Sequence, residues 1–198
     1  MVRLAAFGLG YAAGSITAGF VVGRAFGVDL RIAGTGNVGA SNLARLVGFW
    51  PSFLAFVVDV GKALLVMWLV SDWDSSARVA AGLGLIVGHG WPIWLGFVGG
   101  RGQAVTLAAG LVLAPFGTLA ILPILGIGLF ASRLALSGLV AMTLYPLAAL
   151  LLDGTMAAAY ALGATVLAVA HRLRASPGVR RAPLRQAWQT RLLHDREP

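Results

Sequence analysis

The sequence contains no cysteine, and it has very few acidic side chains or lysines. Without cysteine, the chain has no disulfides, no thiol catalysis and no thiolate ligands for a metal. Lys62 is the only lysine among 15 basic residues, and Asp and Glu together number 7. Charged residues make up 11% of the chain, against about 25% in soluble proteins. Hydrophobic residues make up 59%, which is more than a small soluble domain can bury. The expected solvent of the chain is therefore the lipid bilayer.

The few charges are unbalanced, with a formal net charge of +8. A basic chain can bind nucleic acid, but these arginines are spread between apolar runs and form no patch with interleaved aromatics. The positive charge is better explained by cytoplasmic loops and by attraction to anionic lipids or anionic substrates. We therefore expect membrane lipid as a partner and no nucleic acid.

Apolar runs of membrane-spanning length predict an all-α integral membrane protein. Five single spans are expected, over 4–22, 50–70, 77–95, 134–152 and 155–170. The run 104–132 is short for two full crossings, and we interpret it as two short helices bent near Pro115 and Gly117 or as a re-entrant pair. The five spans and the two segments of 104–132 together predict about seven transmembrane helices in one domain, 1–172, followed by an arginine-rich tail, 173–198.

The distribution of arginine predicts the orientation of these spans. The loops that hold Arg24–Arg45 and Arg101 should be cytoplasmic, as should the tail, and the short loop with Asp72 and Asp74 should be outside. The N-terminus is then outside and the C-terminus cytoplasmic. The first apolar run has no convincing cleavage site, so it is interpreted as a retained helix rather than a signal peptide.

A polar, glycine-rich segment between the first two spans could hold an anion. Its backbone N–H groups are exposed by closely spaced glycines, and its side chains add neutral donors and one guanidinium. The candidate residues are Gly36, Asn37, Gly39, Ser41, Asn42 and Arg45. A glycine-rich loop alone is a weak signal, and an ordinary polar loop with glycine turns is the alternative.

A second segment, 88–102, repeats this pattern. Gly99, Gly100 and Arg101 form another candidate phosphate loop. His89 lies near the end of an apolar span, where it could act as a base, donate a hydrogen bond to an anion, or simply cap a helix. The tryptophans of this segment could be interfacial anchors.

Two charged residues interrupt the second span. Asp59 and Lys62 are three residues apart and therefore share one face of a helix. A charged pair at this depth marks either function or an internal ion pair. The sequence has no Ser-His-Asp spacing, no cluster of metal ligands and no Walker-type loop, so a metal site and covalent serine catalysis lack support.

These motifs together resemble one family, the bacterial acyl-phosphate:glycerol-3-phosphate acyltransferases (the PlsY family). The likeness covers most of the chain. The family's Gly-Ser-Ile-Pro-Thr-Gly run is similar to residues 14–19, its first loop motif to 34–45, and its Asp-x-x-Lys to Asp59 and Lys62. Its Gly-His-x-x-Pro…Gly-Phe-x-Gly-Gly-Lys-Gly motif resembles 88–102, with Arg101 in place of Lys.

The resemblance implies seven transmembrane helices in the bacterial inner membrane and an active site toward the cytoplasm. The substrates would be acyl phosphate and glycerol 3-phosphate, the product lysophosphatidate, and no metal or other cofactor would be needed. The implied catalytic residues are His89, His171 and Ser15. The implied substrate- and phosphate-binding residues are Gly36, Asn37, Gly39, Ser41, Asn42, Arg45, Lys62, Gly99, Gly100, Arg101, Arg133 and Arg172.

The chain also departs from the family pattern. Val98 stands where a basic residue is usual, and the third motif survives only as His171 and Arg172, with Arg174 in place of Asn and Pro177 in place of Arg. The sequence is thus a divergent member. Two other functions remain open: a catalytically degenerate homologue that binds anionic lipid or a membrane partner, and a small anion transporter. The transporter lacks the inverted repeat with paired broken helices that is typical of that class.

Overall fold

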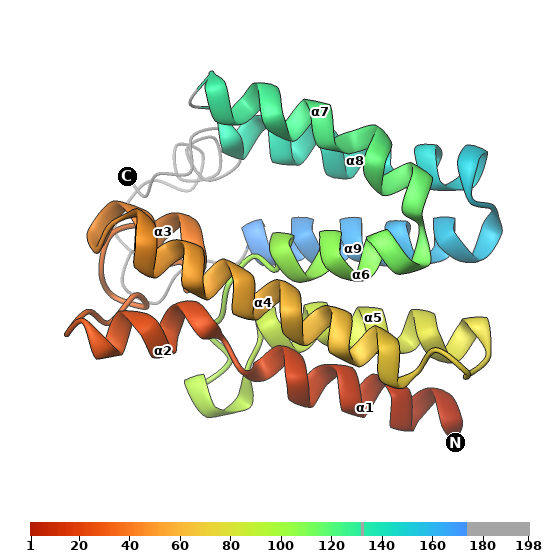
Figure 1. Ribbon diagram of the computed structural model, residues 1–198, viewed down its shortest axis with the longest axis horizontal. Coiled ribbons are helices and arrows are strands. Elements are labelled where there is room, and N and C mark those ends of the chain that lie inside the picture. The colour runs from red at the N-terminus through yellow and green to blue at the C-terminus, as the bar shows by residue number, and fades with distance from the viewer. Residues whose placement is uncertain (132, 174–198) are drawn as a thin grey trace. The chain divides into compact units, whose positions relative to one another are not determined.

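The computed structural model describes residues 1–131 and 133–173, and every regular element in this part of the chain is helical. The elements are α1 (Val2–Ser15), α2 (Ala18–Ala25), α3 (Ala40–Leu46), α4 (Phe49–Leu69), α5 (Ser75–Gly90), the 3-10 turn η1 (Ile93–Leu95), α6 (Gln103–Leu113), α7 (Pro115–Phe130), α8 (Leu134–Leu152) and α9 (Thr155–Leu173) (Figure 1). The prediction of an all-α fold is confirmed for these residues. Nearly all of the predicted tail, 173–198, lies outside them.

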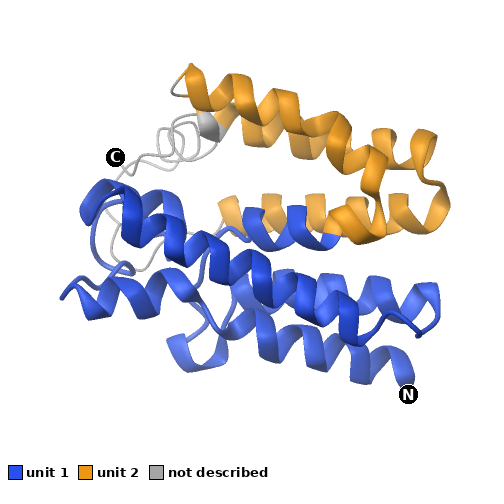
Figure 2. Ribbon diagram, in the orientation of Figure 1, with its two compact units in different colours: residues 1–109, 176–178 blue, residues 110–175, 179–198 orange. Residues whose placement is uncertain are grey.

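The described residues fall into two compact units, which Figure 2 shows in blue and orange. The first holds residues 1–109 and the second 110–173. Each unit is described by itself.

In the first unit, α1 and α5 lie side by side and run parallel, because small residues let their backbones meet (Figure 1). A Cβ at Gly10 would overlap the Ala81 carbonyl, and one at Gly84 would overlap the Phe7 carbonyl. Gly14 and Gly88 are packed in the same way against the facing backbone. Gly10 and Gly14 are four residues apart, as are Gly84 and Gly88, and from the sequence alone this small-xxx-small spacing predicts close helix packing.

The first predicted span, 4–22, is not one continuous helix. The α-helical backbone stops at Ser15 and resumes at Ala18, and Ile16 and Thr17 between them have extended dihedrals. The break leaves the last carbonyls of α1 and the first amides of α2 without helical partners. Residues of α4 and η1 bond these groups, as described below.

The third predicted span, 77–95, ends sooner than expected. Helix α5 stops at Gly90, and Trp91-Pro92 turns the chain into η1 because proline cannot continue the hydrogen-bonded ladder. Gly96 and Phe97 then take left-handed backbone angles. This reversal carries Gly99 and Gly100 back beside the end of α5, where their amides bond the carbonyls of Gly90 and His89.

In the second unit, α8 packs between α7 and α9. Tyr145 of α8 is fully buried, its hydroxyl lies 2.8 Å from that of Thr118, and its ring meets Tyr160 edge-on. Asp153 at the end of α8 accepts hydrogen bonds from the Phe116 and Gly117 amides at the start of α7. The predicted division of 104–132 into two helices near Pro115 is confirmed by α6 and α7.

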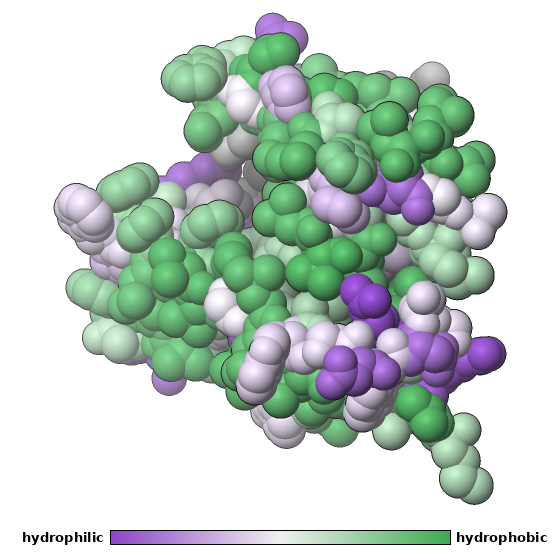
Figure 3. Space-filling model, turned by 45° about the vertical axis from the view of Figure 1, so that its right-hand side comes forward, coloured by the Kyte–Doolittle hydropathy of each residue, from purple (hydrophilic) through white to green (hydrophobic). Residues whose placement is uncertain are grey.

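Large apolar side chains are exposed along most helices, and they dominate the face drawn in Figure 3. Among the described residues, three helical stretches are long and apolar enough to cross a membrane: Val2–Ala25, Phe49–Leu69 and Thr155–Leu173. Shorter apolar helices cover Gln103–Leu113, Pro115–Phe130 and Leu136–Leu152. Apolar side chains facing outward are what a helix in lipid requires.

Candidate active site

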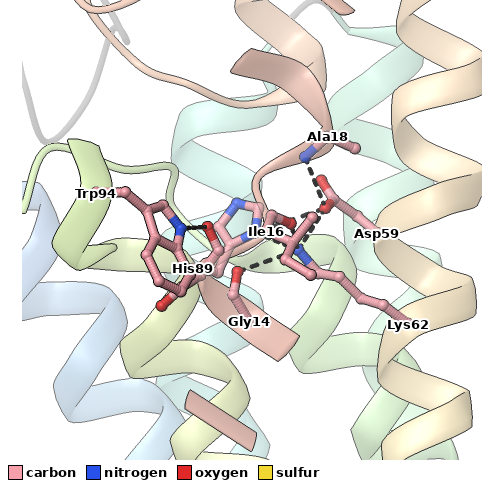
Figure 4. A network of polar contacts seen from close by, with 8 residues as sticks. Gly14, Ile16, Ala18, Asp59, Lys62, His89 and Trp94 are labelled. Carbon is pink, nitrogen blue, oxygen red and sulfur yellow. Dashed lines mark hydrogen bonds and ion pairs between the residues drawn. The ribbon is translucent and has the colours of Figure 1, made fainter. Parts of the chain in front are cut away.

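The break between α1 and α2 is held by an ion pair from α4 (Figure 4). The Lys62 ammonium lies 2.6 Å from Asp59 Oδ1, so the two predicted partners do form an internal pair. Lys62 also donates to the carbonyls of Gly14, at 3.2 Å, and Ile16. An ammonium can donate hydrogen bonds but cannot accept one, so the carboxylate and both carbonyls face it as acceptors.

Asp59 bonds the other side of the same break. Its Oδ1 accepts the Ala18 amide, the first of α2, at 3.4 Å. The cation therefore faces the C-terminal end of α1 and the anion faces the N-terminal end of α2. Both charges match the partial charges of these helix ends. With 2% of Asp59 exposed, this compensation is what allows a carboxylate to be buried there.

Two residues near the end of α5 complete the support of α1. The Trp94 indole donates to the Ser15 carbonyl at 2.9 Å, and the Tyr11 hydroxyl donates to the Trp91 carbonyl at 3.0 Å. Sequence reasoning offered Trp94 only as an interfacial anchor. Its mostly exposed side chain fits that interpretation too, but the bond across 79 positions could not be inferred from spacing.

His89 lies against the ion pair from the side of α5. It is 3% exposed, and its Nδ1 is 3.4 Å from Lys62 Nζ and 3.8 Å from Asp59 Oδ1. The imidazole is thus oriented by two buried charges. A helix cap would not require this arrangement.

The opposite edge of the His89 ring meets the second glycine-rich segment. A Cβ at Gly100 would overlap Nε2 of His89, and the same position is 3.5 Å from the backbone nitrogen of Gly39. The two segments that the sequence singled out therefore adjoin each other at this imidazole. Only a glycine at position 100 leaves room for the ring.

Two buried polar atoms in this region have no hydrogen-bond partner. They are Oγ of Ser15, which is fully buried, and Oδ1 of Asn37, which is 8% exposed. Buried polar groups are almost always paired, and an orphan in a native structure calls for an explanation. Polar ligand groups that bond these atoms would supply one.

The first loop is shaped largely by Asn42. Its amide nitrogen donates to the Ala33 carbonyl at 2.9 Å and to the Leu30 carbonyl at 3.4 Å, and its Oδ1 accepts the Thr35 amide at 3.0 Å. Asn42 is 1% exposed. Its side chain is thus committed to the loop, whereas Ser41 on the same short helix is exposed.

The other predicted binding residues are spread over both units. Gly36 has a left-handed backbone in the first loop, and Arg45 is exposed at the end of α3. Arg101 is half-buried directly after Gly100. In the second unit, Arg133 is exposed before α8, and at the end of α9 His171 is half-buried and Arg172 is buried. Arg174 and Pro177 of the third motif lie outside the described residues.

A second charged cluster is centred on Asp29, which follows α2 and lies outside the spans. Arg31 donates two hydrogen bonds to Asp29, the shorter of 2.8 Å, and Arg24 approaches the same carboxylate to 3.7 Å. The hydrogen bond from the Arg31 guanidinium lowers the pKa of Asp29 to about 2. This carboxylate therefore stays charged and closes the turn that leads into the first loop. Sequence reasoning gave Asp29 no role.

The fold and the site define a helical membrane protein with a broken first helix, an internal ion pair, and a buried histidine at the meeting of two glycine-rich segments. The model of the glycerol-3-phosphate acyltransferase family matches residues 4–177 of this sequence. The chain belongs to that family.

Similar proteins of known name support this family assignment. A glycerol-3-phosphate acyltransferase of Synechococcus sp. (strain CC9902) is 39% identical over 142 residues, which are 68% of this chain and 66% of the relative. One from Parasynechococcus marenigrum (strain WH8102) is 38% identical over 152 residues, or 70% of each chain. The matched stretch is thus just under two thirds of the Synechococcus protein.

Solved structures extend the match to most of the chain. The crystal structure of PlsY (YgiH), an integral membrane glycerol 3-phosphate acyltransferase, in its glycerol 3-phosphate form has a TM-score of 0.77 at 29% identity. The match covers 87% of this chain and 88% of that one. The lysophosphatidic acid form has a TM-score of 0.74 at 27% identity. The predicted fold class, an integral membrane protein built of helices, is confirmed.

Proposed function

We propose that this protein transfers a fatty acyl group from acyl phosphate to the 1-hydroxyl of glycerol 3-phosphate, giving lysophosphatidate for phospholipid synthesis. The observation that carries the proposal is the meeting of the two glycine-rich segments at His89, with the unpartnered Ser15 and Asn37 atoms buried in the same unit. Support comes from the family match and from the relative solved with glycerol 3-phosphate.

The chemistry suits a site without a strong nucleophile. Acyl phosphate is a mixed anhydride and is already activated. The glycerol hydroxyl oxygen forms a bond to the acyl carbonyl carbon, the bond from that carbon to the phosphate oxygen breaks, and the hydroxyl proton ends on the departing phosphate. Such a step needs alignment of the reactants and neutralisation of charge rather than a covalent intermediate.

The proposed roles follow the chemistry of each side chain. Arg45 and Arg101 offer guanidinium forks that suit phosphate. The glycines at 36, 39, 99 and 100 shape the two segments around the ligand, and the amides of Gly36, Gly99 and Gly100 donate to carbonyls within the protein. The Ser15 hydroxyl and the Asn37 carboxamide orient the glycerol hydroxyls, and Ser41 is accessible for the same task.

His89, His171, Arg133 and Arg172 complete the proposed set. His89, which belongs to the first unit, hydrogen-bonds one of the reacting groups. His171, Arg133 and Arg172 belong to the second unit, and their assignment rests on the resemblance to the family motifs. Lys62 and Asn42 are bonded within the protein, so we assign both to holding the site in shape.

We further propose that the protein lies in the bacterial inner membrane with this site toward the cytoplasm. The basic character of the two glycine-rich segments supports that orientation, because loops rich in arginine remain on the cytoplasmic side. A cysteine placed in the acidic loop, at Asp72, should react with an impermeant maleimide added to intact spheroplasts, whereas one at Arg45 should react only after lysis.

The activity is tested with purified protein, acyl phosphate and labelled glycerol 3-phosphate. Lysophosphatidate should form with acyl phosphate and not with acyl-CoA, and the Arg101→Ala variant should lose most of the rate. No product above the Arg101→Ala background would reject the enzyme. Retained binding of glycerol 3-phosphate without turnover would instead favour a catalytically degenerate homologue.

A further inference from the structure

We infer that the Asp59–Lys62 pair is a positioning device, which turns His89 into a hydrogen-bond donor aimed at the meeting point of the two glycine-rich segments. The inference rests on the proposed function, because it explains how His89 is oriented within that same active site. It assigns a role to Asp59, whose carboxylate contacts Lys62, His89 and the Ala18 amide.

The first step is the state of Lys62. Its ammonium lies 2.6 Å from the Asp59 carboxylate and donates to the carbonyls of Gly14 and Ile16. Every one of these neighbours is an acceptor, so the nitrogen is held as a charged donor. A carboxylate and two carbonyls of a broken helix end form a cage that a neutral side chain would leave unsatisfied.

The second step is the tautomer of His89. An ammonium can donate a hydrogen bond but cannot accept one. Because Lys62 Nζ faces Nδ1 at 3.4 Å, a proton on Nδ1 would point at a positive charge. The proton of the neutral imidazole therefore lies on Nε2, since the hydrogen bond made by one ring nitrogen decides which nitrogen carries the proton.

The third step is where Nε2 points. This atom would overlap a Cβ placed on Gly100, and the Gly39 backbone nitrogen is 3.5 Å from that Cβ position (Figure 4 shows the ring and its charged neighbours). Nε2–H is thus a side-chain donor at the junction of both segments. It can donate a hydrogen bond to an anionic oxygen of a phosphate, and the protein rather than a water molecule supplies this donor.

The same pair holds the broken helix. Lys62 bonds the last carbonyls of α1, and Asp59 bonds the first amide of α2. Ser15, whose hydroxyl is unpartnered, is the last residue of α1 before that break. One ion pair therefore fixes both the His89 donor and the backbone that carries Ser15, and substitution of either charge should disturb both.

The test is the nitrogen NMR spectrum of histidine-labelled full-length protein in detergent micelles, with His89→Gln used to assign the His89 signals. In the wild-type protein Nε2 should carry the proton, and inorganic phosphate should shift its signal. In Lys62→Met the proton should move to Nδ1, next to the carboxylate that has lost its cation. Asp59→Asn should give a mixture of tautomers.

Kinetics supply the second readout. Lys62→Met should lower kcat about 10- to 100-fold, the scale of a misplaced reacting group, with a smaller change in KM for glycerol 3-phosphate. Lys62→Arg, which keeps the cation, should restore part of the rate. Trp94→Phe is the matched control, because it removes another bond to the break without changing a charge, and it should leave the tautomer as in the wild-type protein.

Two results would overturn the inference. One is a wild-type His89 with its proton on Nδ1. The other is an unchanged tautomer in Lys62→Met when that protein unfolds at the wild-type temperature. Failure of the wild-type protein to make lysophosphatidate would instead reject the proposed function, and the tautomer would still decide the role of the pair.

Discussion

The imidazole of His89 occupies the space that a side chain at position 100 would need. A Cβ there would overlap Nε2 and come within 3.0 Å of Cδ2 of the same ring. Because His89 is buried between α4 and the glycine-rich segment, its ring has little freedom to move away.

Replacing Gly100 with alanine should therefore displace the ring and lower the acyl-transfer rate about 100-fold, the scale of a reacting group moved by about 1 Å. Gly61→Ala is the control, because a Cβ at that position in α4 meets nothing within 4 Å. The initial rates of the two variants and the wild-type protein check the prediction. Equal rates in the two variants would contradict the placement of His89.

The contact between α1 and α5 predicts a difference between two glycines. Gly84→Ala should reduce the free energy of unfolding by about 1–3 kcal/mol, the usual cost of overpacking, because its Cβ would overlap the Phe7 carbonyl. Gly8→Ala, on α1, meets nothing within 4 Å and should be close to neutral. Thermal unfolding in detergent compares them. A Gly84→Ala protein as stable as Gly8→Ala would show that the helices are further apart.

Substitutions at two neighbouring residues of the first loop should have different effects, one on stability and binding together and the other on binding alone. Asn42→Ala removes three hydrogen bonds within the loop and should lower the unfolding temperature and raise KM for glycerol 3-phosphate together. Ser41→Ala changes an exposed side chain, so it should raise KM and leave the unfolding temperature unchanged. The opposite pattern, with Asn42→Ala as stable as the wild-type protein, would make Asn42 a direct ligand.

The Asp29–Arg31 contact gives a pH-dependent prediction. The pKa of the Asp29 carboxyl is about 2 in the folded protein, below the value of about 3.9 for an unfolded aspartate. The stabilisation is therefore fully present above about pH 4 and is lost as the pH falls through 2. Asp29→Asn should lower the unfolding temperature at pH 7, and the difference from wild type should shrink by pH 3. A constant difference would exclude the ion pair as its cause.

Much of the site is visible in the sequence because its parts are local patterns. The spacing of Asp59 and Lys62 places both on one face of a helix, and they form the ion pair. The glycines at 10, 14, 84 and 88 predict close helix packing, and each meets the facing backbone.

What the sequence does not reveal depends on partners that are distant along the chain. Ile16 and Thr17 are ordinary residues for an apolar helix, and the break at them is held by Lys62 and Asp59, more than 40 positions away. Trp94 reaches back to Ser15 for the same reason. The early end of α5 could have been inferred from Trp91-Pro92, since a proline ends a helical ladder.

The central claim is that this site joins an acyl group to glycerol 3-phosphate, and phosphorus NMR of one reaction mixture tests it most directly. The signal of acyl phosphate should fall while inorganic phosphate and lysophosphatidate rise in equal amounts, and Gly100→Ala should slow all three changes together. Inorganic phosphate without lysophosphatidate would mean hydrolysis rather than transfer, and an unchanged spectrum would contradict the account.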